Sequence, residues 1–587
     1  MLICRVKRDC YRDSVFLMRL AKDLLNVSGV ADAAIMMGTE TNKAALRKCG
    51  LLSGDGEHAG PTDLIIAIRA STASAAESAV EAALTWLDQR NSSSTSAAAY
   101  ATLELALAEH PEANIALISV PGDYAASEAR RALGRGLHVM LFSDNVPLDE
   151  EAELKRQAAL AGLLMMGPDC GTAIIDGTPL GFANVVRRGD VGVVAAAGTG
   201  LQEVTTLLDR AGFGISQAIG TGTHDLSDTI GAAMMLQGID RLEADPATRI
   251  IVVVSKPPAP HVAEKVVQRL ARCAKPTVVN FLGYAPASPV AGPRFATFLE
   301  DVVTEVAGVA RCSFWLARAD VEALLAEQTS RLGPAQKAIR GLFAGGTFCY
   351  EAQLVLEPMI GPVASNAPVR GQHLDSAVLE TAGHIAVDLG DDEFTRGRPH
   401  PMIEPALRNR LVVEQAARQD TAVILADVLL GYGSHADPAG QLAAAIRQAR
   451  AAAQAQGRDV SFVVSVCGTS GDPQDLAKSE AKLREAGAAV LPTNAQAARF
   501  AGLVVNRSAL PADAVCSTPF SFRPSEFAGP ATASHSSILG RTPFVINVGV
   551  RGFYDDLVRA GARAVHVDWR PAAGGDRRLV DVLARIM

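Results

Sequence analysis

Short apolar runs alternate with segments of helical spacing along most of the chain. The runs at 114–120 (NIALISV), 137–144 (LHVMLFSD) and 249–255 (RIIVVVS) are apolar nearly throughout, and amphipathic segments lie between such runs. Strands of this kind, separated by helices, are typical of parallel sheets whose two faces are both covered. The pattern therefore predicts an α/β protein.

The first 90 residues have another pattern. Three strand-like runs, at 2–7, 30–38 and 62–70, are separated by helical segments, and a Ser- and Ala-rich stretch follows at 91–99. This order predicts a small N-terminal α+β domain, residues 1–100, whose last residues form a linker.

Three blocks of regular strand–helix alternation follow the linker. They cover residues 113–190, 191–330 and 337–510, and the last two share one plan, in which a strand runs into a Gly-Thr turn and a helix. Residues 511–587 form a carboxyl-terminal extension, which is a candidate for docking a partner protein.

Charge and cysteine content exclude several classes of protein. The formal net charge is -8, and no basic stripe is available to neutralise the phosphates of a nucleic acid. The nine cysteines are scattered without a CxxC pair, which fits buried thiols in a reducing cytosol.

No uncharged apolar run approaches the roughly 20 residues that span a bilayer, and the N-terminus lacks signal-peptide features. We therefore expect a cytoplasmic protein that binds neither nucleic acid nor membrane.

Two Gly-rich turns are candidates for binding a small anion. The turn residues are Gly198, Thr199 and Gly200 after the run VGVVAA, and Gly345, Gly346 and Thr347 after GLFA. At the carboxyl end of a parallel strand, free backbone N–H groups and the helix dipole both attract anions. Such turns also occur simply as tight turns, and neither matches a Walker-type loop.

Polar segments supply further candidates for the chemistry. His224 lies in GTGTHDLSD (220–228), as a candidate for proton transfer or as an ordinary polar loop residue.

In RGRPHPMI, two prolines stiffen the backbone around Arg396, Arg398 and His400. Guanidinium groups suit carboxylate or carbamoyl oxygens, so this segment is a candidate for holding the substrate. The alternatives are a solvated loop, or cation binding by the preceding acidic residues, whose spacing is not diagnostic of a metal.

These segments together resemble the FdrA family, which is related to the α and β subunits of succinyl-CoA synthetase. The similarity runs through PGDYAASEARRALGRGLHVMLFSDNV, MGPDCGT, VGVVAAAGTG, GTGTHDLSD, SKPP, FLGYAP, AGGT, DLGDDEFTRGRPHPMI and INVGVRGF. It covers nearly the whole chain. The resemblance implies several doubly wound, Rossmann- or flavodoxin-like domains: 113–190 would be CoA-binding-like, 191–330 α-subunit-like and 337–510 β-subunit-like.

The resemblance also implies one phosphate-sized pocket. In succinyl-CoA synthetases a phosphorylated histidine docks between the N-termini of two helices, and the matching turns here are 198–200 and 345–347. However, the segment that matches the region of the active histidine, 285–302, contains no histidine, and the ATP-grasp half of the β subunit has no counterpart. We therefore do not expect an ATP-driven phosphohistidine relay.

FdrA-like proteins are also similar to a subunit of oxamate carbamoyltransferase. That system cleaves oxalurate with phosphate, giving oxamate and carbamoyl phosphate in purine catabolism, and it works with two partner proteins. The resemblance implies a carbamoyltransferase subunit that uses phosphate as a substrate, holds a small anionic substrate and acts with other subunits in an oligomer. The sequence does not support a bound CoA or ATP. The alternatives are a subunit of an acyl-CoA synthetase and a non-catalytic scaffold.

Overall fold

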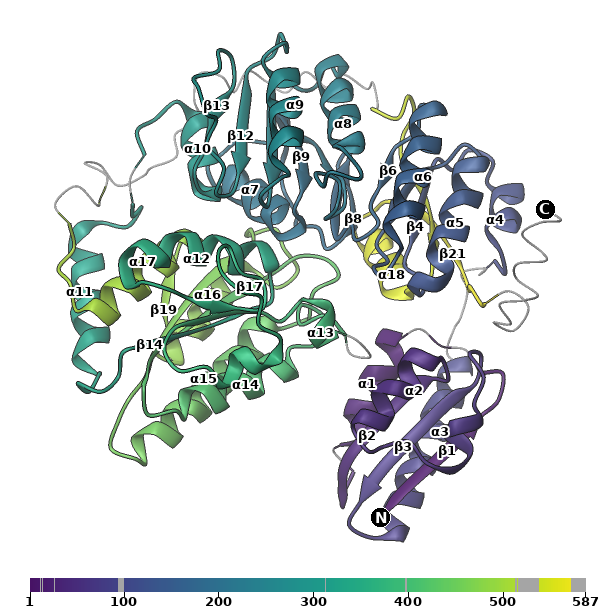
Figure 1. The fold of residues 1–587 in the computed structure, drawn as a ribbon. Helices are drawn as coiled ribbons and strands as arrows, with labels where there is room; N and C mark the ends of the chain where they lie inside the picture. Colours follow the sequence, from purple (N-terminus) through teal and green to yellow (C-terminus); the bar gives the residue numbers. More distant parts are fainter. Residues whose placement is uncertain are drawn as a thin grey trace.

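Four β-sheets organise the chain in the computed structural model (Figure 1). The structure describes residues 1–10, 12, 14–25, 27–92, 100–311, 313–395, 399–511, 515 and 538–571. One sheet has three strands, and the others have five, six and seven. The predicted α/β class with parallel sheets is confirmed, as is the small N-terminal α+β domain.

The N-terminal domain is a three-stranded antiparallel sheet with helices on it. Its elements are β1 (Leu2–Lys7), α1 (Ser14–Leu24), β2 (Val30–Met37), α2 (Glu40–Lys48), the 3-10 helix η1 (Gly54–His58), β3 (Leu64–Ala70) and α3 (Ala73–Ser92). The strand order is β1-β3-β2, and both pairings are antiparallel. Apolar residues of α1 and α3, such as Leu17 and Val80, pack with Ile66 and Ile68 of β3.

The seven-stranded sheet carries the first Gly-rich turn. Its strands are β7 (Thr172–Ile175), β8 (Thr178–Gly181), β9 (Arg188–Ala196), β10 (Ile215–Gly220), β11 (Ile250–Ser255), β12 (Thr277–Phe281) and β13 (Arg294–Phe295), and its helices are α7 (Gly198–Arg210), α8 (Ala233–Ala244), α9 (Pro260–Leu270) and α10 (Leu299–Ala307). The order is β13-β12-β11-β9-β10-β7-β8. Alternate residues of β11 face opposite sides, because Val252 packs with the core around α7 while Val253 packs with the core around α9.

The six-stranded sheet carries the second turn. Its strands are β14 (Ala338–Phe343), β15 (Ala364–Ser365), β16 (Ile385–Asp388), β17 (Thr421–Leu429), β18 (Ser461–Cys467) and β19 (Ala489–Leu491). Its helices are α12 (Gly346–Ile360), α14 (Ala406–Ala416), α15 (Pro438–Gln454), α16 (Leu476–Glu485) and α17 (Asn494–Asn506), with the short α13 (Asp392–Thr395) and η2 (Ser376–Glu380) in its loops and α11 (Arg318–Ser330) before it. All pairings are parallel, in the order β15-β16-β14-β17-β18-β19.

One hydrophobic core joins these two sheets. It contains residues of α7 and α10 from one unit and of α12 and α17 from the other, including Leu201, Val302, Phe348 and Phe500. The helices of the two units therefore pack directly on each other, with α7 against α12 (Figure 1). This packing brings the N-termini of α7 and α12 into one place.

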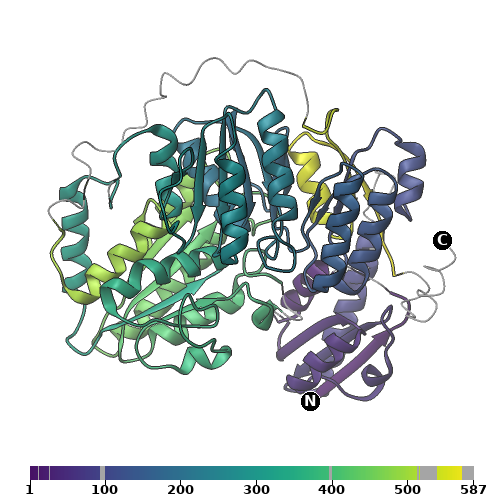
Figure 2. The same cartoon turned by 45° about the horizontal axis from the view of Figure 1, so that its top comes forward.

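The five-stranded sheet combines strands from residues 115–166 with strands from residues 544–567. Its strands are β4 (Ile115–Ile118), β5 (His138–Leu141), β6 (Met165–Met166), β20 (Phe544–Val548) and β21 (Arg563–Val567), and its helices are α4 (Leu103–Glu109), α5 (Gly122–Gly134), α6 (Leu148–Leu160) and α18 (Arg551–Arg559). The order is β21-β20-β4-β5-β6, and every pairing is parallel. Both views show the yellow carboxyl-terminal elements among the blue ones of residues 100–166 (Figure 2).

Two predicted domain boundaries do not follow the sheets. Residues 538–571 are not a separate extension, because β20 pairs with β4 and is buried along its whole length. Strands β7 and β8 belong to the seven-stranded sheet, so the boundary between the two units lies before β7, whereas the sequence predicted it at residue 190, after β8. Within the described ranges, no helix is both long and apolar enough to cross a bilayer.

Candidate functional site

The two Gly-rich turns meet at the N-termini of α7 and α12. The backbone N–H of Thr347 donates a hydrogen bond to Oγ1 of Thr199 at 3.3 Å. A Cβ atom added to Gly200 would lie 3.1 Å from Cγ2 of Thr347, and one added to Gly345 would lie 3.0 Å from Cγ2 of Thr199. The structure thus brings together the six turn residues that the sequence singled out, and two positive helix ends face one small region.

A buried carboxylate shapes the second turn. Asp427, at the end of β17, accepts hydrogen bonds from the backbone N–H groups of Ala344 at 2.8 Å and Gly345 at 2.7 Å. The guanidinium group of Arg408, itself buried, donates to the carbonyl and carboxylate oxygens of Asp427 at 2.7 and 3.3 Å. The N–H of Gly345 is therefore not available to a ligand, which narrows the predicted role of this residue to shaping the turn.

The remaining N–H groups of the turns are free to bind an anion. Among the residues that the structure describes, the N–H groups of Gly198, Thr199, Gly200 and Gly346 have no acceptor. Such groups at the first turn of a helix have no partner inside the helix, so a ligand or water must satisfy them. Anion binding at these positions follows from that requirement.

Lys256 is a cation at this place that the sequence analysis missed. It follows β11 directly, and its Nζ would lie 3.0 Å from a Cβ atom added to Gly346. Lys256 makes no hydrogen bond or ion pair with the part of the chain that the structure describes. In the sequence, the only indication of this role is that Lys256 is a charged residue directly after an apolar strand. The segment SKPP has no residue spacing that is typical of a ligand-binding motif.

Asp388 and Thr347 present two further polar groups at the N-terminus of α12. A Cβ atom on Gly346 would collide with Oδ2 of Asp388, so only glycine fits here. Oδ1 of Asp388 accepts from the N–H of Gly390 at 2.9 Å, whereas Oδ2 has no partner among the described residues. Thr347 is 1% exposed, and its hydroxyl also has no partner there. Burial raises the pKa of Asp388 to about 6, and the nearby Lys256 opposes this rise.

His400 lies beside Asp388. Its Nε2 would be 2.6 Å from a Cβ atom added to Gly390, and its Nδ1 accepts a hydrogen bond from the N–H of Met402 at 3.2 Å. Burial lowers the pKa of His400 to about 4, so the ring is neutral at pH 7 and carries its proton on Nε2. His400 is thus a hydrogen-bond donor at the edge of the site, and Arg396 and Arg398 lie outside the described residues.

His224 belongs to a neighbouring ion network. Its Nδ1 lies 3.4 Å from Oε2 of Glu151, whose Oε1 is 2.7 Å from Nζ of the buried Lys155. Lys155 also binds Asp225 at 2.8 Å, and Asp225 caps the N-terminus of α8. The hydrogen bond to Glu151 raises the pKa of His224. His224 therefore lies on a loop anchored by buried charges, and no direct contact joins it to the two turns in the described structure.

Family models match three parts of the chain. Residues 342–504 match a model described as CoA-ligase, and residues 186–283 match one described as CoA binding domain. Residues 1–102 match a model described as AllF, heavy metal-associated domain. The first two matches cover the strands and helices that form the paired turns.

A full-length relative decides the family. YahF of Escherichia coli (strain K12), described as an uncharacterized protein, is 42% identical over 487 residues, which are 82% of this chain and 94% of YahF. The chain belongs to the succinyl-CoA synthetase-like family that includes YahF. The finer FdrA assignment stays a prediction.

Several other proteins similar to this chain are named as ligase subunits. The subunit SauD of the ADP-forming sulfoacetate-CoA ligase from Bilophila wadsworthia is 26% identical over 164 residues, which are 27% of this chain and 54% of SauD. The chain therefore spans only about half the length of this relative. Among solved structures, ATP citrate lyase from Methanothrix soehngenii, in complex with citrate and coenzyme A, is 15% identical, with 73% of this chain and 88% of that chain covered and a TM-score of 0.29.

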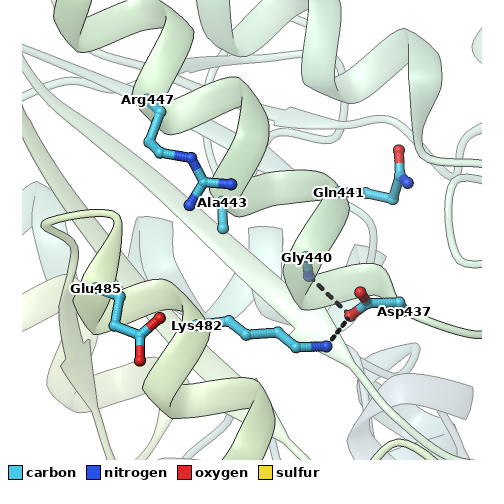
Figure 3. A pocket seen from close by; sticks show the side chains of 7 residues that line it. All are labelled: Asp437, Gly440, Gln441, Ala443, Arg447, Lys482 and Glu485. Carbon is cyan, nitrogen blue, oxygen red and sulfur yellow. Dashed lines mark hydrogen bonds and ion pairs between the residues drawn. The ribbon is translucent and has the colours of Figure 1, made fainter.

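A polar depression lies on the other side of the six-stranded sheet, between α15 and α16 (Figure 3). Asp437 accepts from the N–H of Gly440 at 2.9 Å and from Nζ of Lys482 at 2.8 Å, so its charge is paired. This depression is separate from the two Gly-rich turns, because α15 and α16 pack in another core than α12. In the described ranges, no group of three or more His, Cys, Asp or Glu residues is arranged to hold a metal ion.

Proposed function

We propose that the chain is a subunit of a carbamoyltransferase of the oxamate carbamoyltransferase type, which cleaves oxalurate with phosphate. The observation that carries this proposal is the meeting of two helix N-termini, with free N–H groups and an unpaired Lys256, in a chain without a histidine at 285–302. Phosphate would be held by Gly198, Thr199, Gly200, Gly346 and Thr347, with Gly345 shaping the turn. A site of this kind binds an anion, and the segment that matches the region of the synthetases' phosphorylated histidine, 285–302, contains no histidine.

The reaction needs positioning and charge stabilisation. An oxygen of HPO₄²⁻ attacks the carbamoyl carbon of oxalurate, and the bond from this carbon to the oxamate nitrogen breaks. The nitrogen takes the proton that the phosphate gives up, so oxamate and carbamoyl phosphate leave with all atoms accounted for. Negative charge develops on the carbonyl oxygen during the attack, and positioned N–H groups stabilise such charge. Holding two anions together lowers the barrier further.

The side chains around the turns have roles in this proposal. His400 would donate the Nε2 proton in a hydrogen bond to the substrate, and Arg396 and Arg398 would bind its carboxylate. His224 would assist proton transfer from the neighbouring ion network, in which Glu151 favours its charged form.

The assembly and the compartment are also part of the proposal. The matched relatives include proteins named as ligase subunits, which supports a complex with partner subunits. The free thiols of the described cysteines support a cytoplasmic location. Phosphate is a substrate in this proposal, which assigns no bound cofactor.

The proposal is tested with the complete complex. The chain, purified with its partner subunits, is incubated with oxalurate and phosphate, and carbamoyl phosphate is measured by coupling to a kinase that forms ATP from it. We expect product that depends on phosphate. Absence of product with all partners present would remove the substrate assignment.

A second candidate function is that of an acyl-CoA synthetase subunit. It is favoured by the five-stranded sheet, because β20, the turn at Gly549 and α18 supply a strand–turn–helix unit beside β4. Ligands of doubly wound sheets bind where the strand order reverses, here between β20 and β4. Arg551 and the turn at Gly549 would hold the CoA phosphates, and CoA would supply a thiol to accept the acyl group. CoA binding that Arg551→Ala abolishes would favour this function.

A further inference from the structure

An unpaired acceptor and an unpaired cation lie side by side at the N-terminus of α12. Oδ2 of Asp388 and Nζ of Lys256 both border the point where a Cβ atom of Gly346 would lie. The two side chains form no direct ion pair with each other, and neither atom has another partner among the described residues. Asp388 is 6% exposed, and leaving its oxygen without a donor is costly unless a ligand or water supplies one.

Asp388 is held rigidly in this orientation. The side chain of Asn366 binds its backbone on both sides, donating to the carbonyl oxygen and accepting from the N–H, each at 2.9 Å. Oδ1 is fixed by the N–H of Gly390. In this structure Oδ2 is therefore directed at the N-terminus of α12, with its position set by β16 and by the loop after it.

A carboxylate is an unusual neighbour for an anion site, and it favours ligands that carry a hydrogen-bond donor at this point. It repels a second anion but accepts a hydrogen bond from an N–H group. A carbamoyl group presents an NH₂ on the carbonyl carbon, where an acyl group presents a CH₂ or CH₃. An acceptor placed beside the phosphate site therefore distinguishes these two classes of transferable group.

The geometry points to Asp388 as the residue that selects a carbamoyl over an acyl group, with Lys256 holding the phosphoryl end of the same ligand. This inference rests on the proposed function and names the substrate class of its site. A ligand that leaves a buried polar group of the site without its hydrogen bond binds much more weakly than one that makes this bond. A difference in hydrophobic contact alone separates two ligands by a smaller factor.

Charged and titratable groups surround Asp388 on each side. Lys256 faces it from β11, Asp391 from the following loop, and Asp427 from β17, where Arg408 neutralises Asp427. Cys349 faces it from α12, and the neutral ring of His400 lies beside it across Gly390. With Lys256 as the near cation, Asp388 is ionised at pH 8 and both of its oxygens accept hydrogen bonds.

The test compares two stable ligands of equal charge. Phosphonoacetamide carries an NH₂ on its carbonyl carbon, and acetonylphosphonate carries a CH₃ at the same position. Their affinities for the full-length chain are measured by calorimetry at pH 8. We expect phosphonoacetamide to bind at least about 10-fold more tightly. Equal affinities would overturn the inference but leave the anion site intact, whereas absence of binding by both ligands and by inorganic phosphate would remove the anion site itself.

Two variants separate the roles of the two residues. Asp388→Asn places an amide donor where Oδ2 lies, so the preference for phosphonoacetamide should disappear; Asp388→Ala is the second variant in case the first folds poorly. Lys256→Gln should weaken both ligands alike, by about 10-fold, because the lost contact is to the phosphonate. Asp240→Asn and Lys265→Gln are surface controls that should change neither affinity. A preference that persists in both Asp388 variants would assign the selection to another residue.

Discussion

The hydroxyl of Ser119 accepts a hydrogen bond from the backbone N–H of Val550 at 2.8 Å, although 431 residues separate them. Gly549, between β20 and α18, has a φ of 119°, and a Cβ atom there would lie 2.6 Å from the carbonyl oxygen of Ser119. The turn after β4 and the turn after β20 are therefore fitted to each other. Read from β20, the strands follow the order 2-1-3-4-5, which is that of a doubly wound sheet whose first unit has moved to the end of the chain.

Ile546→Ala should destabilise the domain that contains residues 100–166. Ile546 is completely buried in β20, in one core with β4, so its truncation leaves a cavity and should cost about 2–5 kcal/mol. Thermal unfolding and limited proteolysis of residues 100–166 measure the effect. Val558→Ala, at a site that is 51% exposed, is the control and should change little. Unchanged protease resistance of 100–166 in the Ile546 variant would mean that this segment folds without β20.

The sequence predicted the paired turns but not the permuted sheet. The turns at 198–200 and 345–347 follow the apolar runs VGVVAA and GLFA, which predicted their place at strand ends, and the family resemblance supplied their pairing. The segment INVGVRGF also has a strand, a Gly-rich turn and a helix. Its partner strand, however, lies about 430 residues earlier, and no local pattern encodes a pairing over that distance.

Lys256 and Asp388 could be found only in the structure. Lys256 directly follows β11 and Asp388 is the last residue of β16, and these two buried strands belong to different sheets. Their proximity depends on how α7 and α12 pack, which is a property of the shared core. Asp388 begins the polar stretch DLGDDEFTRGRPHPMI, in which the sequence favours Arg396, Arg398 and His400 as substrate ligands, and the two arginines lie outside the described residues.

Gly346→Ala should abolish anion binding without unfolding the chain. The new methyl group would collide with Oδ2 of Asp388 and crowd Nζ of Lys256, so both side chains must move from the site. We expect phosphate affinity to fall at least about 10-fold, since a charge-assisted contact is lost. Gly134→Ala is the matched control, because a Cβ atom there meets open space. Phosphate affinity is measured by calorimetry, and an unchanged value in the Gly346 variant would place the anion elsewhere.

Thr347→Val should reduce affinity while sparing stability. Valine keeps the shape of the side chain and removes a hydroxyl that has no hydrogen-bond partner among the described residues, so the free energy of unfolding should change by less than about 0.5 kcal/mol. If this hydroxyl binds phosphate, affinity should fall by about 10-fold. Thr205→Val on α7, whose hydroxyl donates to Leu201 at 2.8 Å, should leave affinity unchanged. A drop in melting temperature with normal affinity would instead indicate a structural role for Thr347.

Two buried glutamates join the helices that bear the turns. Glu351 of α12 accepts hydrogen bonds from the N–H of Leu299 at 2.7 Å and from the amide of Asn494 at 2.8 Å, and the N–H of Asn494 donates to Glu203 of α7 at 3.4 Å. Burial raises the pKa of Glu203 to about 7 and that of Glu351 to about 8. Glu300, also buried, pairs with Arg499 and adds negative charge beside both.

Stability should therefore fall as the pH rises from 5 to 8. In the unfolded chain both glutamates ionise near pH 4.3, whereas in the folded chain they keep their protons up to about pH 7 and 8. The folded state thus binds more protons than the unfolded state over this range. The contribution of the two glutamates to the free energy of unfolding is on the order of a few kcal/mol; it is fully present below about pH 4 and is lost as the pH rises through their pKa values in the folded state. Glu351→Gln has no proton to lose, so its melting temperature should decline less between pH 5 and 8 than that of the wild type. Glu414→Gln, at an exposed position of α14, should follow the wild type. A Glu351→Gln curve parallel to the wild type would show that Glu351 is already ionised at pH 5, and that its contacts with Leu299 and Asn494 hold a charge.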